Sequence, residues 1–230
     1  DLKIITVIGF PLVANFSYIK AQEAKECIEA GADALILTGI TTGKSPSVDD
    51  ALKYYGLSAK CFELAKMKKN AAVVYLQTAI LYSQRLNDMG NYEKMLTKCI
   101  ETAPDVSEDA YVELYYLYKD KNDTVKCGDI LAKAKKLFAE TPEKLYEPEM
   151  DYYAMTGDEE KLLATVDKAA STGDAAMIPI CATYLTNAKQ YAKAEQVLKD
   201  AIEKSPNDFT LLSKMGYRYA MEYYDIMDRR

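Results

Sequence analysis

Residues 178–206 read IPICATYLTNAKQYAKAEQVLKDAIEKSP, and this stretch decides the fold. Its apolar residues recur at helical spacing on both sides of a short polar break, which is typical of two amphipathic helices joined by a tight turn. The side chains follow an order of large, large, small, large, aromatic, small, large, small and proline at Ile178, Cys181, Ala182, Leu185, Tyr191, Ala194, Leu198, Ala201 and Pro206. Small residues let the paired helices approach closely, and large residues fill the space between them.

The same order begins again 34 residues later, where Leu212, Met215, Gly216 and Tyr219 stand at the matching places. Earlier in the chain, Pro104 and Pro142 lie 38 residues apart, and Pro142 and Pro206 lie 64 apart, or two intervals of about 32. This order and period resemble the tetratricopeptide family, whose helix-turn-helix unit has about 34 residues. The resemblance is clearest after Tyr111, and Ser47 to Asn70 matches only in outline.

The spacing of apolar residues in the whole segment from Ser47 to Arg230 predicts helices of about 12 to 20 residues. Ser47-Val48-Asp49-Asp50 is typical of a helix start. Short polar breaks separate the predicted helices: Met89-Gly90-Asn91, Lys121-Asn122-Asp123, Thr156-Gly157-Asp158, Thr172-Gly173-Asp174 and Ser205-Pro206-Asn207. We therefore expect a mainly α protein, a solenoid of about five helix pairs.

The first 46 residues have a different pattern. Lys3 to Ile8 and Asp33 to Thr38 are apolar, strand-like runs, and Ser17 to Ala30 has helical spacing and ends at Gly31. Strand, helix and strand in this order predict a βαβ unit with two parallel strands. The expected domains are a βαβ fragment at residues 1–46 and a helical-repeat domain at 47–230.

The string Ile5-Thr6-Val7-Ile8-Gly9-Phe10-Pro11-Leu12, followed by Ile19 to Lys25 and Gly31-Ala32-Asp33, resembles part of deoxyribose-phosphate aldolase, a (β/α)8 barrel. The resemblance implies the second strand, second helix and third strand of that barrel. It also implies a catalytic aspartate near the end of the third strand, where this chain has Ile36, and a Schiff-base lysine from a later strand that has no equivalent here. We therefore expect no enzyme activity. A natural fusion and an engineered chimera both remain open.

The segment Thr38-Gly39-Ile40-Thr41-Thr42-Gly43-Lys44 carries two glycines that could let backbone amides face a phosphate. It lacks the spacing of a phosphate-binding P-loop. The alternative interpretation is a plain connection that leads into the helix start at Ser47.

Nineteen tyrosines are a further feature of this chain. The tetratricopeptide resemblance implies that the first helices of the pairs line a concave, peptide-binding face, where tyrosine offers large contact area and a polar tip. In this register the groove-facing residues are Tyr115, Lys119, Tyr146, Glu149, Tyr153 and Tyr217. The alternative is packing between helices, which we expect for Tyr191 and Tyr219.

Composition excludes several functional classes. The net charge of -6 and the absence of a basic face argue against a nucleic-acid partner. The sequence has no apolar run long enough to span a membrane. Without histidine, and with five scattered cysteines, it predicts no metal site and no cofactor. Such cysteines favour reduced core thiols and a reducing compartment such as the cytoplasm, although Asp1 in place of Met leaves a removed signal peptide open.

Three functional hypotheses follow. The first is a scaffold that binds a protein or peptide on the concave face of the repeat. The second is a structural module that forms a homodimer through the edges of the N-terminal strands, with Ile5, Val7, Leu35 and Ile36 at the contact. The third is a barrel-derived enzyme or a phosphate-ligand binder.

Overall fold

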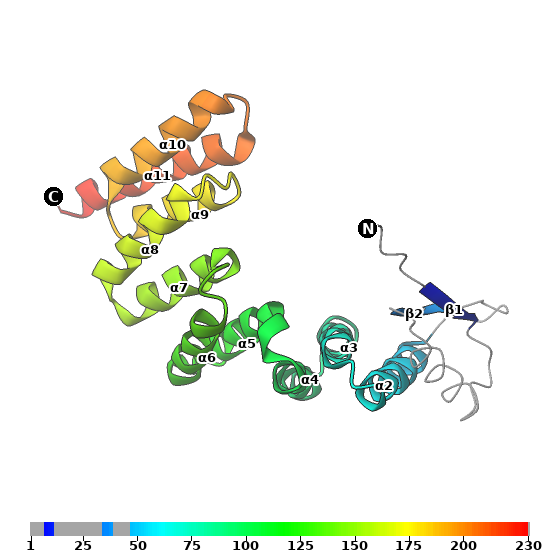
Figure 1. The fold of residues 1–230 in the computed structure, drawn as a ribbon. Coiled ribbons are helices and arrows are strands. Elements are labelled where there is room, and N and C mark those ends of the chain that lie inside the picture. The colour runs from blue at the N-terminus through cyan, green and yellow to red at the C-terminus, as the bar shows by residue number, and fades with distance from the viewer. Residues whose placement is uncertain (1–6, 12–33, 39–46, 230) are drawn as a thin grey trace. The chain divides into compact units, whose positions relative to one another are not determined.

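A computed structural model of the chain describes residues 7–11, 34–38 and 47–229 (Figure 1). These residues are mainly helical, as the sequence predicts, with ten α-helices, α2 to α11, after residue 47. The chain divides into two compact units, Asp1–Leu117 and Tyr118–Arg230. This division falls inside α5 (Glu108–Asp120). The sequence-based boundary between residues 46 and 47 stays a prediction.

The first unit contains a two-stranded parallel sheet of β1 (Val7–Pro11) and β2 (Ala34–Thr38), in which Val7 pairs with Ala34 and Pro11 with Thr38. The prediction ended the first strand at Ile8, but the strand continues through Gly9-Phe10-Pro11. Proline is tolerated there because it stands at the strand end. Residues 3–6 and the predicted helix at 17–30 lie outside the described residues, so the βαβ unit as a whole stays a prediction.

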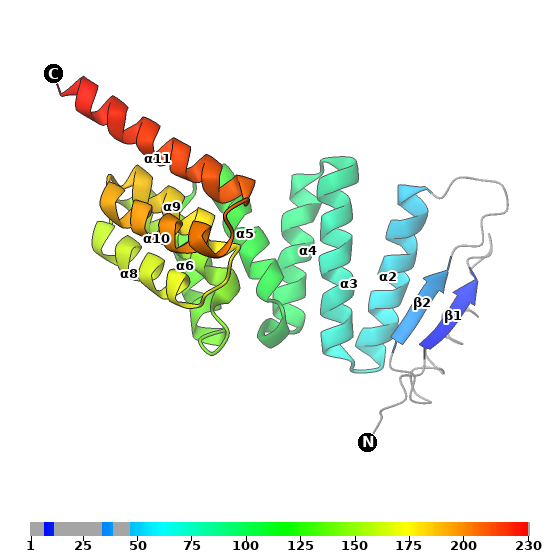
Figure 2. The same ribbon diagram turned by 90° about the horizontal axis from the view of Figure 1, so that it is seen from above.

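The helices of the first unit pack in chain order, α2 on α3 and α3 on α4 (Figure 2). They are α2 (Val48–Leu64), α3 (Lys68–Leu81) continued by a π-helical turn (Tyr82–Leu86), and α4 (Met89–Thr102), followed by a 3₁₀ turn (Pro104–Val106) and α5. Alanines at 71, 72 and 79 of α3 are almost fully buried, which lets the neighbouring helices approach closely.

The second unit contains α6 (Thr124–Leu137), a 3₁₀ turn (Glu143–Leu145), α7 (Tyr146–Thr156), α8 (Glu159–Ser171), α9 (Met177–Asn187), α10 (Tyr191–Lys204) and α11 (Phe209–Asp228). α7 packs on α8, α8 on α9, and α9 on α10, while α11 packs on both α9 and α10. Consecutive helices therefore form most contacts of this unit, and the alternate helices α7 and α9, and α9 and α11, also contact each other.

Local sequence explains where the helices begin. The Ser47 hydroxyl accepts a hydrogen bond from the Asp50 amide at 3.0 Å, which confirms the predicted helix start. Aspartate caps four later helices in the same way, at positions 88, 123, 158 and 208. One predicted break was misplaced: Met89-Gly90-Asn91 is the first turn of α4, and the chain reverses at Asn87, whose φ of 51° is left-handed. Asparagine tolerates that conformation better than most residues.

The second unit has two hydrophobic clusters. The larger joins α7, α8 and α9 around fully buried Met150, Val166 and Leu185. The smaller joins α9, α10 and α11 through Ala182, Leu198 and Leu211. The core is therefore broad at α7–α9 and narrows toward the last helix.

Four cysteines, at positions 61, 99, 127 and 181, are buried free thiols, which confirms the core interpretation for these four; Cys27 lies outside the described residues. In the part of the chain that the structure describes, no helix combines the length and apolar character needed to cross a membrane.

Candidate binding groove

The second unit has a groove of about 770 Å³ on the face formed by α7, α9 and α11. These are alternate helices in the chain, and the segment before α9 also contributes. The lining residues are Glu147, Asp151, Ala175, Ala176, Pro179, Ile180, Thr183, Tyr184, Asn187, Asp208, Thr210 and Lys214. A second hollow of about 540 Å³ shares Asp151, Tyr184 and Asn187 with it, so the concave surface continues along α7 and α9.

Asp151 is the central polar group of this surface. It is only 8% exposed, although it lies within an otherwise largely apolar helix. The Lys119 ammonium donates to its carboxylate at 2.8 Å, and the Tyr184 hydroxyl donates to the same oxygen at 3.2 Å. A buried charge needs such partners, because an unpaired carboxylate would lose its solvation. Asp151 therefore ties the end of α5 and α9 to α7 at the base of the groove.

The rim of the groove is more acidic than basic. Glu147 stands one helical turn before Asp151, and Asp208 caps α11 by accepting from the amides of Thr210 and Leu211. Lys214 is the one basic residue among the lining side chains of this groove. The charge of Lys119 balances that of Asp151. The rim then has two negative charges, on Glu147 and Asp208, and one positive charge, on Lys214, so its net charge is negative.

Two of the predicted groove tyrosines pack against the core of the protein, one fully buried and one half-buried. Tyr115 is 1% exposed, and its ring meets that of Tyr116 edge to face with centroids 5.4 Å apart. A ligand has no access to Tyr115, so its assignment to the groove surface is corrected. Tyr146 is half-buried and packs on the core cluster of Met150 and Val166. The alternative interpretation, packing between helices, therefore applies to Tyr115, while contact of Tyr146 with a ligand stays a prediction.

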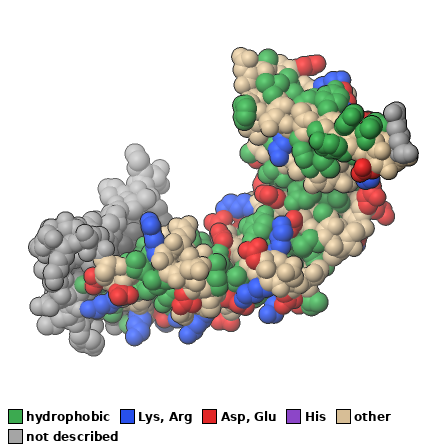
Figure 3. All heavy atoms as spheres, turned by 180° about the vertical axis from the view of Figure 1, so that it is seen from behind, with side chains coloured by type: hydrophobic (Ala, Val, Ile, Leu, Met, Phe, Trp, Pro, Cys, Tyr) green, Lys and Arg blue, Asp and Glu red, His purple; other side chains and the backbone are tan. Residues whose placement is uncertain are grey.

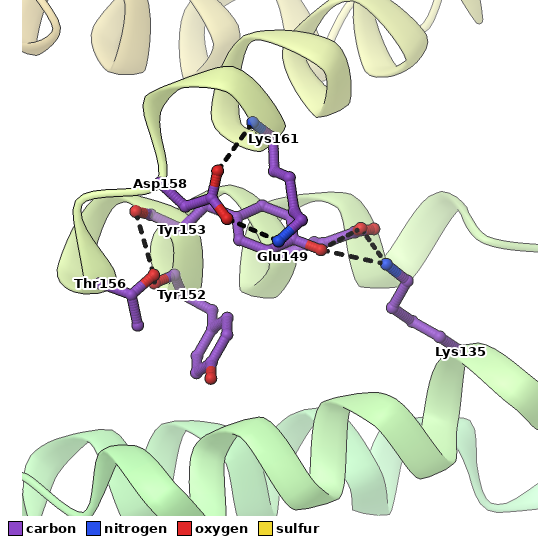
Figure 4. A network of polar contacts seen from close by, with 7 residues as sticks. All are labelled: Lys135, Glu149, Tyr152, Tyr153, Thr156, Asp158 and Lys161. Atoms are coloured by element: carbon purple, nitrogen blue, oxygen red, sulfur yellow. Dashed lines mark hydrogen bonds and ion pairs between the residues drawn. The ribbon is translucent and has the colours of Figure 1, made fainter.

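Glu149 and Tyr153 follow Glu147 and Asp151 by two residues each, which turns their side chains by about 200° around α7. Figure 4 shows Glu149 and Tyr153 beside Lys135. Glu149 forms an ion pair with Lys135 of α6, and the Tyr153 hydroxyl donates to Glu149 at 3.3 Å. Burial by itself would lower the pKa of the Lys135 ammonium, but the hydrogen bond and charge of Glu149 outweigh it and raise that pKa. Glu149 therefore joins α6 to α7, while Tyr153 also lines the second hollow.

Figure 4 shows a second ion pair nearby, in which the Lys161 ammonium donates to Asp158 at 2.6 Å. This hydrogen bond lowers the pKa of the Asp158 carboxyl, which also caps α8 through the Lys161 amide. The pair stabilises the start of α8 and lies at the surface. Its role is structural.

Lys119 and Tyr217 are the two predicted residues that lie beside the groove. Lys119 pairs with Asp151, as described above. Tyr217 is 39% exposed, and its hydroxyl donates to the Asn187 side-chain oxygen at 2.8 Å, which links α11 to α9. Sequence reasoning missed Asp151 and Tyr184. A lone aspartate between Met150 and Tyr152 was the available signal for the first.

The residues predicted for self-association lie in or near the sheet. Val7, Leu35 and Ile36 belong to β1 and β2, which pair with each other, and Ile5 lies outside the described residues. Among the described residues, no further strand joins this sheet, whose order is β1-β2. Association through its outer edges stays a prediction.

Comparison with known proteins finds similarity to deoxyribose-phosphate aldolases over parts of the chain. The Lactococcus lactis subsp. cremoris enzyme is 53% identical over 49 residues, 21% of this chain and 22% of that protein. The Histophilus somni enzyme is 66% identical over 32 residues, 14% of each chain. The Treponema denticola enzyme is 33% identical over 129 residues, 54% of this chain and 58% of that protein. No protein-family model matches the chain.

These matches support the aldolase resemblance of part of the chain, and the chain spans between a seventh and three fifths of the lengths of the three proteins. The Treponema denticola match covers 54% of the chain, which is more than residues 1–46 can hold. It therefore extends into the helical region.

Proposed function

We propose that residues 47–230 form a tetratricopeptide-like repeat whose groove on α7, α9 and α11 binds a protein or peptide partner. The observation that carries this proposal is the groove itself, because it is lined by alternate helices of one unit. In a repeat of helix pairs, alternate helices are the equivalent members of successive pairs and share one face.

The 34-residue offset between α9 and α11 supports the same register. Ile178 and Leu212, Ala182 and Gly216 are equivalent under this offset. α10, which lies between α9 and α11 in the chain, packs on both of them, as the second helix of a repeat does.

The chemistry of the rim favours an extended peptide with a basic side chain. Glu147 and Asp208 supply acceptors, while Thr183 and Asn187 offer neutral hydrogen-bonding groups. Ala175, Ala176 and Ile180 give the groove apolar walls that exclude water around such a contact. A lysine or arginine of the partner placed near Glu147 would gain a charge-assisted hydrogen bond.

A displayed library of random peptides, selected on the purified full chain, tests the proposal. Selected peptides are expected to bind in fluorescence anisotropy, and Thr183→Arg is expected to abolish binding because a long charged side chain fills the groove. Thr141→Arg is the matched control, since Thr141 is exposed and does not line the groove. Equal binding by both variants would refute the assignment.

Glu147→Lys tests the charge preference separately. We expect it to weaken the binding of peptides with lysine or arginine by about tenfold, which corresponds to one charge-assisted hydrogen bond. Peptides without a basic residue are expected to bind this variant as they bind the unchanged chain. An equal loss for both groups of peptides would contradict the preference for a cation.

The aldolase similarity raises a second candidate function, a barrel-derived enzyme or phosphate-ligand binder, and the catalytic residues expected of an aldolase decide how we treat it. We propose that the chain is not an aldolase, because the aldolase resemblance requires an aspartate where Ile36 stands, and the Schiff-base lysine has no equivalent. Deoxyribose 5-phosphate is the substrate for the test. Turnover that survives purification and is lost when a lysine of this chain is replaced would overturn this proposal.

The N-terminal strands remain a candidate for self-association. Their pairing within one chain uses one edge of each strand, and among the described residues no strand pairs with the other edge of either strand. Ile36→Lys is expected to lower the molecular mass in solution if these edges join two chains. An unchanged mass would remove the strands from any dimer contact.

A further inference from the structure

One face of α11 carries a line of exposed apolar residues, which we call the α11 stripe. Its members are Phe209, Leu212, Gly216, Tyr219, Tyr223 and Ile226. The five side chains range from 47% exposed at Leu212 to 83% exposed at Phe209. Their spacing alternates between three and four residues, which is the pattern of a seam between two packed helices.

The equivalent face of α9 is covered by a neighbouring helix. Ala182 is 1% exposed and Leu185 is fully buried, and Ala182 clusters with Leu198 of α10. Gly216 and Tyr219 stand 34 residues later, and Tyr219 is 49% exposed. The α11 stripe therefore occupies the position at which a further helix packs in the preceding pair.

Gly216 adds an independent indication of a helix contact. It lies in the middle of a 20-residue helix, and a Cβ atom added there would meet nothing within 4 Å. Glycine weakens a helix interior, and no close contact in the described chain requires it here. Exposed Ser213 and Ala220 stand on either side of it. Ser213, Gly216 and Ala220 are small, and they lie beside the large apolar residues of the stripe. Small side chains at these places allow the backbone of another helix to approach closely.

We propose that the α11 stripe packs against the same stripe of a second copy of this chain, across a two-fold axis near Gly216. The stripe is self-complementary in an antiparallel arrangement, because Gly216 lies near its middle and the large residues stand toward both ends. In Figure 2 the C-terminal end of α11 extends past α9 and α10, while Tyr219 and Asp225 still bond to Glu195 and Lys189. A second copy therefore has access to the side of α11 that faces away from α10. A two-fold dimer is also the commonest symmetric assembly.

Charge and area fit this occupant. The residues beside the stripe include Ser213 and Ala220. Two acidic neighbours, Glu222 and Glu195, are both paired with Arg218, at 2.8 Å and 2.9 Å, and Glu195 also accepts a hydrogen bond from the Tyr219 hydroxyl at 3.1 Å. Arg218 therefore balances part of the negative charge beside the stripe. Complete burial of the exposed parts of the five side chains of the stripe in two copies would remove about 1,200 Å² from water, which is the lower end of specific interfaces. Hydrophobic side chains also gather on the surface of this unit in Figure 3.

The α11 stripe is separate from the binding groove. Thr210 and Lys214 line the groove, and Tyr217 points to Asn187 of α9. These residues lie on another side of the same helix, since they do not share the spacing of the stripe. A dimer through the stripe leaves the groove open, and the two functions can be tested independently.

The molecular mass of the full chain, measured by light scattering over a range of concentrations, is the first test. We expect a dimer at high micromolar concentration. Tyr223→Glu and Leu212→Glu are each expected to weaken it by at least about tenfold, because a carboxylate would be buried in the contact. Val125→Glu is the matched control, because Val125 is 75% exposed on α6, away from the stripe. This variant is expected to dimerise normally.

Cross-linking gives a positive test that does not depend on a destabilising variant. Gly216→Cys is expected to form a disulfide-linked dimer under mild oxidation, whereas Val125→Cys and the unchanged chain are not. A monomeric unchanged chain at high micromolar concentration would overturn the proposal and assign the stripe to another occupant. It is equally overturned by a dimer that survives both glutamate variants, or one that only Ile36→Lys dissociates.

Discussion

Helices α9 and α11 occupy equivalent places 34 residues apart, yet their equivalent faces are in opposite environments. Leu185 of α9 is fully buried between α7, α8 and α10, while Tyr219 of α11 is 49% exposed. Both helices are apolar along this face. The difference comes from the number of helices that pack on each one. That number cannot be predicted from the sequence of either helix alone.

The comparison shows what an apolar face means in a helical array. On α9 the apolar face belongs to the core, because α8, which precedes α9 in the chain, and α10, which follows it, both pack against α9. On α11 the same pattern remains at the surface of the described structure. An exposed apolar face of this size marks a contact surface in most soluble proteins.

The largest expected effect is a matched pair of leucine truncations. Leu185→Ala is expected to lower the free energy of unfolding by about 2 to 5 kcal/mol, since it leaves a cavity in a fully buried cluster. Leu212→Ala is expected to cost less than about 1 kcal/mol in dilute solution, because Leu212 is 47% exposed. Urea denaturation of both variants measures the difference. Equal losses would show that the face of α11 is covered within the chain.

The next effect tests the close approach of α9 and α10. Ala194 is fully buried, so Ala194→Leu is expected to cost about 1 to 3 kcal/mol through overpacking. Ala192 is exposed on the same helix, and Ala192→Leu serves as the control with little expected change. Thermal unfolding followed by circular dichroism compares them. A neutral result for Ala194→Leu would contradict the repeat register.

Two glycines sharpen the comparison at a smaller scale. Gly157 has a left-handed φ of 71° after α7, so Gly157→Ala is expected to destabilise the protein by about 1 to 2 kcal/mol. Gly216 is helical and uncrowded, so Gly216→Ala is expected to stabilise the monomer by about 1 kcal/mol. It is also expected to weaken the dimer. Destabilisation of the dilute monomer by Gly216→Ala would mean that the chain itself needs the glycine.

The smallest effect concerns alkaline pH. Burial raises the pKa of the Cys181 thiol from its ordinary value of 9.0 to about 11. The unfolded chain therefore loses this proton first as pH rises, so the stability is fully present below pH 9 and falls between pH 9 and 11. We expect a loss below about 1 kcal/mol near pH 9.5.

Cys181→Ala is the variant for this test. It is expected to reduce the dependence of the unfolding midpoint on pH in that window, although it also changes the stability at neutral pH. Identical dependence in both proteins would show that the thiol does not titrate on unfolding in this range.

Local signals in the sequence predicted the helices well, and long-range pairing less well. Ser47 and the aspartate caps mark helix starts because a side-chain oxygen can satisfy the first free amides of a helix. The predicted C-terminal end of β1 was wrong, because a strand ends where its pairing with the partner strand ends. Pro11, the last residue of β1, pairs with Thr38, which lies 27 residues away in the chain.

The groove residues were harder to predict than the helices that carry them. On α7 the prediction chose Tyr146, Glu149 and Tyr153. Glu147 and Asp151 line the larger groove, and Tyr153 lines the second hollow beside it. A shift of two residues turns a side chain by about 200° around a helix, so a small error of register moves a residue to another face. The register depends on how α7 packs against α6, where Lys135 pairs with Glu149.

The sequence by itself determined that most of the chain is helical, where several of the helices start, and which residues are apolar. These properties depend on hydrogen bonds and side chains within a few residues of each other. Only the tertiary structure decided which apolar face became core and which acid became a groove residue. Leu185 and Tyr219 differ in burial, and Asp151 differs from Glu149 in its partners, because these outcomes depend on neighbouring helices that are distant in the chain.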